Sequence, residues 1–112
     1  MDGHSLDRLA DEHLAIAREH GSGRSAVTVH GGREHHLRQT LIALAGGRAL
    51  GEHESPGEAT LQVLRGRVTL HAGGAQWTGE AGDFLLIPPE RHDLEALEDA
   101  AVLLTVANRL GD

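Results

Sequence analysis

The chain has 112 residues, enough for one domain with a single core. It contains no cysteine, which excludes disulfides and thiolate chemistry. All ten basic residues are arginines, and the net charge of −7 without a basic patch argues against nucleic-acid binding. No apolar run approaches the roughly 20 residues of a membrane span, and the acidic N-terminal stretch is unlike a secretory signal. We therefore expect a cytoplasmic protein that binds neither nucleic acid nor membrane.

Residues 5–20 are predicted to form a helix. Apolar residues such as Leu9 and Leu14 recur along one stripe at helical spacing. Ser5 suits the N-cap position, and the glycines that follow residue 20 are expected to end the helix. Because the stripe is narrow and partly alanine, the helix should pack on something larger, either its own sheet or a partner subunit.

From residue 25 onward, short apolar runs alternate with glycine-containing turns. The runs predict strands at residues 26–30, 37–44, 49–54, 59–64, 67–71, 75–78, 83–87, 92–96 and 101–107. Closely spaced strands without β–α–β alternation predict an all-β fold, an antiparallel sandwich or barrel.

Two stretches combine glycine, histidine and proline at fixed spacings. The first, GRALGEHESPGEATLQVLRG, starts at Gly47 and contains His53. The second, GDFLLIPPERHDLEAL, starts at Gly82 and contains His92. Together they resemble the two motifs of the cupin family over residues 37–107. The resemblance implies a jelly-roll barrel of antiparallel strands, often dimeric and open at one end. Residues 1–24 would form an N-terminal helix and connector, and residues 25–112 the barrel.

The resemblance also implies a metal site, from which this sequence departs. Cupins usually hold a metal with two histidines and a glutamate of the first motif and a histidine of the second. Carried over by position, His53 and His92 remain, while Ser55 replaces a histidine and Ala59 replaces the glutamate. A catalytic metal site normally takes three protein ligands, so two histidines alone should bind a divalent transition metal only weakly. The sequence leaves open a third ligand among His30, His35, His36, Gln39 and His71.

Strand alternation predicts which side chains share the interior with the two histidines. Residues two apart in a strand lie on one face, so Glu54 and Glu58 should point away from it. The expected ligand pocket consists of His53, Ser55, Ala59, Leu61, Val63, His92 and Leu94. Trp77 is expected to anchor packing rather than bind a ligand.

The sequence leaves several functions open. The preferred one is a small-ligand binding or sensing barrel, a homodimer with an incomplete metal site. The alternative is a metal-dependent enzyme of the dioxygenase, isomerase or decarboxylase type, using His53 and His92 plus an unidentified third ligand. A metal-free epimerase would use a histidine as general base, but the chain has no tyrosine to serve as the acid. A partner-protein role would use the N-terminal helix, Thr60 and Gln62 as a dimer seam.

Overall fold

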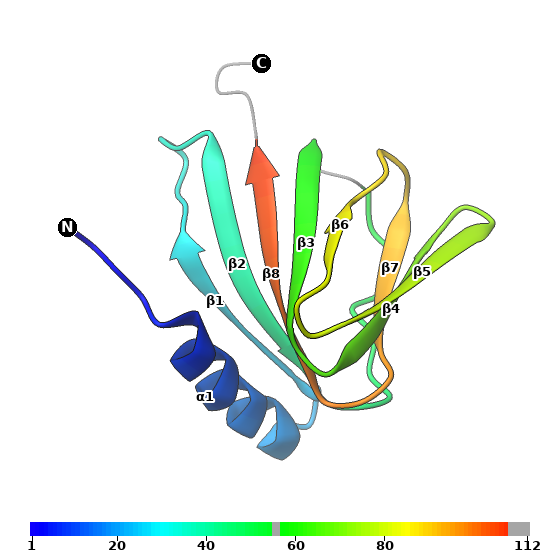
Figure 1. Cartoon of the computed structure of the whole chain (residues 1–112), viewed down its shortest axis with the longest axis horizontal. Helices are drawn as coiled ribbons and strands as arrows, with labels where there is room; N and C mark the ends of the chain where they lie inside the picture. Colours follow the sequence, from blue (N-terminus) through cyan, green and yellow to red (C-terminus); the bar gives the residue numbers. More distant parts are fainter. Residues whose placement is uncertain (55–56, 108–112) are drawn as a thin grey trace.

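The computed structural model describes residues 1–54 and 57–107 of the chain. Its regular elements are one helix and eight strands, and the strands pair with one another antiparallel (Figure 1). They are α1 (Leu6–Glu19), β1 (Arg24–His30), β2 (Leu37–Leu44), β3 (Glu58–Arg65), β4 (Arg67–Ala72), β5 (Ala75–Glu80), β6 (Phe84–Leu86), β7 (His92–Ala96) and β8 (Ala100–Ala107). The prediction of a mostly β chain with antiparallel strands and one N-terminal helix is confirmed.

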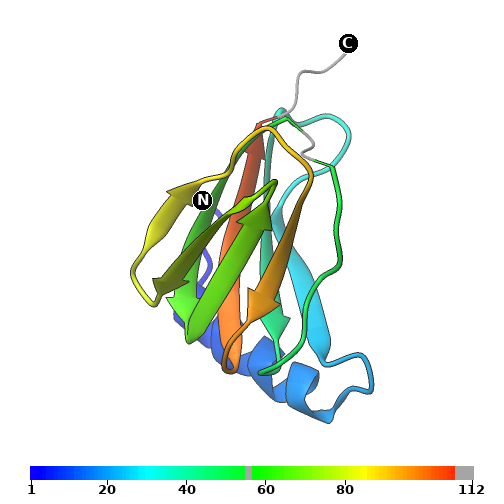
Figure 2. The ribbon, with the colours of Figure 1, turned by 90° about the vertical axis from the view of Figure 1, so that its right-hand side faces the viewer.

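The strands form two sheets that face each other. The larger sheet has the order β1-β2-β8-β3-β6, and the smaller has the order β5-β4-β7. Figure 2 shows the smaller sheet in front of the larger one, with α1 on the far side. Along β3 and β7 every second side chain, including Leu61 and Leu94, is buried between the sheets. The alternation that predicted these strands therefore identifies the main core.

The helix α1 covers the outer face of the larger sheet. Ser5 caps its first turn, where the Ser5 hydroxyl accepts a hydrogen bond of 3.2 Å from the N–H of Arg8. Helix and sheet meet in a second apolar cluster, rich in alanine, that lets the two backbones approach closely. Its buried members are Ala10, Leu14, Ala17, Leu41, Ala43 and Ala101. Of the two expected partners for the helix, its own sheet is the one it packs against.

The prediction of a strand at residues 49–54 is wrong. The backbone of this segment pairs with β7 at two isolated bridges, Ala49 to Glu95 and His53 to His92. Between them Gly51 has a φ of +96°, which an extended strand does not accommodate. The segment therefore follows the edge of β7 without forming a continuous ladder.

The two sheets are open to each other along one side. β5 ends the smaller sheet and β6 ends the larger one, and the described residues contain no pairing between these two strands. At the other edge of the smaller sheet, the bridges at Ala49 and His53 attach the β2–β3 connection to β7. This arrangement of facing antiparallel sheets is consistent with the expected jelly roll. In the same residues, no helix has the length and apolar character that crossing a membrane requires.

Candidate functional site

His53 and His92 lie next to each other at one end of the two sheets. His92 is the first residue of β7, and its main-chain N–H and C=O both bond to those of His53 at 2.9 Å. The two imidazole rings are in edge-to-face contact, with centroids 4.4 Å apart and planes at 68°. The His92 residue is only 4 % exposed, whereas His53 is exposed. The pair thus presents one ring to solvent and one beneath it.

Main-chain carbonyls fix the tautomer of both rings. Nδ1 of His53 lies 2.9 Å from the carbonyl oxygen of Gly51, and Nδ1 of His92 lies 2.8 Å from that of Glu90. A carbonyl oxygen can only accept, so each Nδ1 carries the hydrogen and donates it. In each neutral ring this leaves the lone pair on Nε2, which bonds to no other described residue. The pair therefore offers two acceptor nitrogens.

A charged clamp, made of Arg91, Glu52 and Glu54, links the β2–β3 connection to the residue just before β7. Arg91 donates to Glu52 at 2.6 Å and to Glu54 at 2.9 Å. These hydrogen bonds, first that to Glu52, raise the pKa of the Arg91 guanidinium above its ordinary value. Asp93 adds a further tie by accepting from the N–H of Gly51 at 2.8 Å. Sequence reasoning missed the clamp, although the Glu–His–Glu alternation around His53 was its visible signal.

Beneath the rings, the space between the sheets is almost filled. The cavity there measures about 20 Å³, close to the space one water molecule needs. Of the seven residues expected to line a pocket, His53, Leu61, His92 and Leu94 do so, together with other leucines and isoleucines. Ala59 and Val63 are buried in the main core at 2 % and 1 % exposure, and Ser55 lies outside the described residues. A ligand of the pair therefore approaches from the exposed end.

Four of the five residues considered as a third metal ligand have other contacts. His71 alternates with buried residues of β4, and its Nε2 lies 3.9 Å from the Glu95 carboxylate. Gln39 donates to the hydroxyl of Thr105 at 3.2 Å. His30 and His35 pack against each other, with ring centroids 4.5 Å apart. None of these contacts involves His53 or His92.

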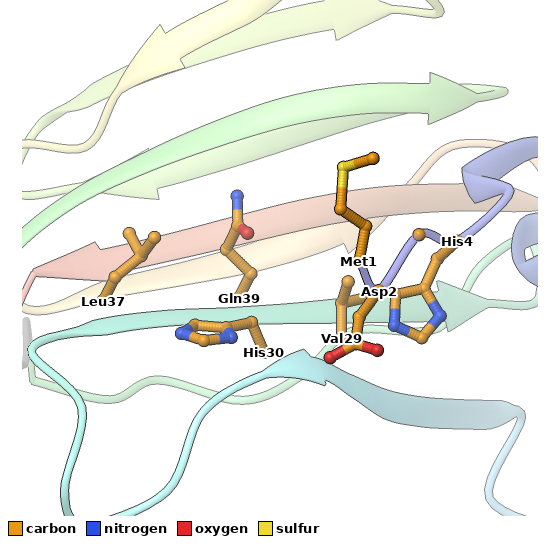
Figure 3. A pocket seen from close by; sticks show the side chains of 8 residues that line it. Met1, Asp2, His4, Val29, His30, Leu37 and Gln39 are labelled. Carbon is orange, nitrogen blue, oxygen red and sulfur yellow. The ribbon is translucent and has the colours of Figure 1, made fainter.

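A larger hollow, of about 700 Å³, lies away from the histidine pair. Figure 3 shows its wall: Asp2 and His4 come from the N-terminal segment, and His30 and Gln39 come from β1 and β2. Gln39 and Leu41 are two apart in β2, so Gln39 lies on the sheet face that α1 covers. The hollow shares no residue with the cavity beneath the histidines and is a separate feature.

A sequence profile described as Cupin domain matches residues 40–107, more than half of the chain and a range that contains both histidines. The chain belongs to the cupin family. The family resemblance of the two motifs is thereby confirmed. No curated protein sequence matches this cupin.

Solved structures of other proteins share the fold. An RmlC-like cupin protein from Desulfovibrio desulfuricans aligns with a TM-score of 0.71 and 24 % identity over 96 % of both chains. A conserved protein of unknown function from Streptococcus pyogenes gives the same TM-score and identity, over 80 % of this chain and 78 % of its own. A point mutant of salicylate 1,2-dioxygenase from Pseudoaminobacter salicylatoxidans gives 0.71 at 20 % identity, over 90 % of this chain and 32 % of its own. At these identities the likeness shows the fold alone.

The residues of this cupin that the structure describes do not provide the donor set of a complete metal centre. Among the residues that the structure describes, no group of three His, Asp or Glu side chains lies close enough to hold an ion. Ala59, which the motif spacing assigns to the position of the family's glutamate, is buried in the main core, and its methyl group offers no donor. Two imidazoles fall short of the three protein ligands that a catalytic metal site normally has.

Proposed function

We propose that this cupin is a small-ligand binding or sensing protein, a jelly-roll barrel whose recognition element is the His53–His92 pair. The observation that carries the proposal is the pair of Nε2 lone pairs, one on each ring, left by the two Nδ1–H bonds to main-chain carbonyls. Two fixed acceptors, one on the exposed His53 ring and one on the buried His92 ring beneath it, suit a small molecule with hydrogen-bond donors, such as hydroxyl groups. The metal site is incomplete, and no metal is part of the recognition.

Metal analysis of the purified protein tests this proposal. We expect much less than one transition-metal ion per chain, and only weak heat signals when Zn²⁺ or Ni²⁺ is titrated in. His71→Ala is the matched control, because His71 faces away from the core on β4. Stoichiometric, tightly bound metal that is lost in His53→Ala and kept in His71→Ala would show that the pair belongs to a metalloprotein.

A second candidate is a metal-dependent enzyme of the dioxygenase, isomerase or decarboxylase type. The same two hydrogen bonds favour it, because metal-ligating histidines commonly donate their other ring N–H to a carbonyl or carboxylate. One of the similar structures is a salicylate 1,2-dioxygenase mutant. This function needs a third protein donor beside His53 and His92. Replacing both histidines with alanine should then abolish metal uptake and activity together, and metal retention in the double variant would exclude it.

We also propose that the protein acts as a cytoplasmic homodimer. Phe84 and Leu86 on β6 are 63 % and 62 % exposed, so in the single chain these two large apolar side chains lie in contact with solvent. They lie beside Gln62 and Thr60 of β3 in the sheet register, so the expected dimer seam gains two apolar residues. The acidic, cysteine-free composition agrees with a cytoplasmic location.

A further inference from the structure

A second cavity lies where the sheets are open to each other, and residues of the edge strands β5 and β6 belong to its lining. We call it the lateral cavity; it measures about 180 Å³. Its lining includes Leu70, Ala72 and Trp77 from the smaller sheet, and Leu85, Pro88 and Glu90 from β6 and the β6–β7 connection. Most of this lining is apolar, and Glu90 is its one charged side chain among the described residues.

Trp77 gives the lateral cavity an aromatic wall. Its indole lies over Gly79 of the same strand so closely that a Cβ at Gly79 would collide with the six-membered ring. The ring is half-buried against the main core, so its position is fixed while part of it borders the cavity. The face of an indole attracts cations as well as apolar groups.

Glu90 gives the cavity a negative charge. Its carboxylate reaches across to the β4–β5 turn, where one oxygen lies 2.8 Å from the position a Cβ would take on Gly73. The charged residues that follow Glu90 in the sequence have other partners: Arg91 donates to Glu52 and Glu54, and Asp93 accepts from the N–H of Gly51. In the part of the chain that the structure describes, the Glu90 carboxylate has no ion pair or side-chain hydrogen bond.

We propose that the lateral cavity is a binding site for a small organic cation: a protonated amine carried on an aromatic or short aliphatic group. An apolar cavity of about 150 Å³ holds a benzene ring, so the lateral cavity has room for one ring and a few more atoms. The apolar group packs against Leu70 and Leu85, and the ammonium lies between the Trp77 ring and the Glu90 carboxylate. The net charge of −7 further favours a cation over an anion.

The site is separate from the histidine pair and does not rest on the proposed function. The lateral cavity and the small cavity beneath His53 and His92 have one lining residue in common, Leu70. A ligand in the lateral cavity is therefore divided from the histidines by a leucine side chain, and it uses neither Nε2 atom.

Intrinsic fluorescence tests the proposal directly, because Trp77 is the only tryptophan of the chain. Benzylamine, benzyl alcohol and benzoate carry the same ring with a cationic, a neutral and an anionic form at pH 7. We expect a saturable change of Trp77 emission with benzylamine, with affinity five- to tenfold higher than for benzyl alcohol and higher still than for benzoate. Equal affinities for benzylamine and benzoate, or no saturable change with benzylamine, would overturn the proposal.

Three variants locate the binding. Glu90→Gln should weaken benzylamine about five- to tenfold and leave benzyl alcohol unchanged. Glu98→Gln, the matched control, removes the same charge at the opposite end of β7 and should change neither. Ala75→Leu should fill the cavity and abolish binding of both while far-UV circular dichroism keeps the spectrum of the unchanged protein. Benzylamine binding that survives Ala75→Leu, or that is lost in His53→Ala, would place the ligand elsewhere and refute the assignment.

Discussion

At the scale of single residues, Gly66 between β3 and β4 is the position where a side chain is least tolerable. Its φ is +72°, and a Cβ there would collide with the carbonyl oxygen of Asp99 and lie 2.9 Å from Cα of Ala100. Both neighbours are backbone atoms and cannot rotate away. The glycine thus lets the β3–β4 turn pass directly over the start of β8.

We predict that Gly66→Ala lowers the free energy of unfolding by about 3 kcal/mol, the sum of a left-handed backbone cost and an overpacking cost. Gly47→Ala is the matched control: Gly47 also has a positive φ, +87°, but nothing lies within 4 Å of its Cβ position. The free energy of unfolding of that variant should fall by only about 1 kcal/mol. Urea unfolding followed by circular dichroism measures both, and equal losses would refute the argument from close approach.

At the scale of elements, the attachment of α1 to the larger sheet depends on its buried stripe. Leu14 is 5 % exposed in the cluster shared with the sheet, whereas Ile16 on the same helix is 44 % exposed. We predict that Leu14→Ala costs about 3 kcal/mol of unfolding free energy, and that Ile16→Ala costs less than about 1 kcal/mol. Denaturant titrations of the two variants compare these losses; a helix that packs without using its stripe would give similar values.

The end of α1 is also tied to two turns through Asp99. Asp99 accepts from Arg18 at 2.6 Å and from the N–H of Gly46 at 2.8 Å. The Arg18 hydrogen bond first, then that of Gly46, lower the pKa of the Asp99 carboxyl below its ordinary value. A carboxyl whose pKa is lower in the folded state adds stability above its unfolded pKa, and this is lost as pH falls through the folded pKa.

We therefore predict that Asp99→Asn is less stable than the unchanged protein near pH 7, by less than about 1 kcal/mol because the ion pair is partly exposed. The difference should stay constant down to about pH 4 and shrink below it. Urea unfolding at a series of pH values measures it, and a difference that grows toward acid pH would contradict the assignment.

The strands also show which elements can be predicted from local sequence patterns. Strands 37–44 and 92–96 were predicted with the bounds the structure has, because their alternation and bounding turns are local signals. The strand expected at 49–54 failed at Gly51, whose positive φ could have been suspected from a glycine inside a strand pattern. The lateral cavity could not be predicted, because it depends on which strand edges stay unpaired, and pairing is set by contacts distant in sequence.

In the candidate site, too, the features set by local sequence were predictable and those set by distant contacts were not. The motif spacing places His53 and His92 in one site, and their rings are in contact. Glu54, which strand parity places on the other face, accepts a hydrogen bond from Arg91. The tautomers could not be predicted, since they depend on carbonyls that turn back toward each ring. The small size of the cavity beneath the rings could not be predicted either, because it depends on how leucine and isoleucine side chains from several strands pack together.

At the scale of the whole molecule, the acidic charge opposes the association of two chains, whereas the apolar seam favours it. Each chain carries a net charge of −7, so two chains repel each other when they associate. The outer face of β3 and β6 offers Thr60, Gln62, Phe84 and Leu86, none of which is charged. Association through these four residues buries apolar surface, while Glu58, at the start of β3 on the same face, lies at the margin of the seam.

We predict a homodimer whose affinity rises when salt is increased from about 20 to about 300 mM, because salt screens the repulsion between like-charged chains. Leu86→Ser, combined with Phe84→Ser, should give a monomer at every salt concentration, since it removes the exposed apolar pair from the seam. Leu97→Ser is the control, because Leu97 is also exposed, at 44 %, but lies beyond β7 on the other sheet. Light scattering after size exclusion measures the mass of each. A double variant that stays dimeric would mean that the chains associate through another face, and affinity that falls with salt would mean that charge holds them together.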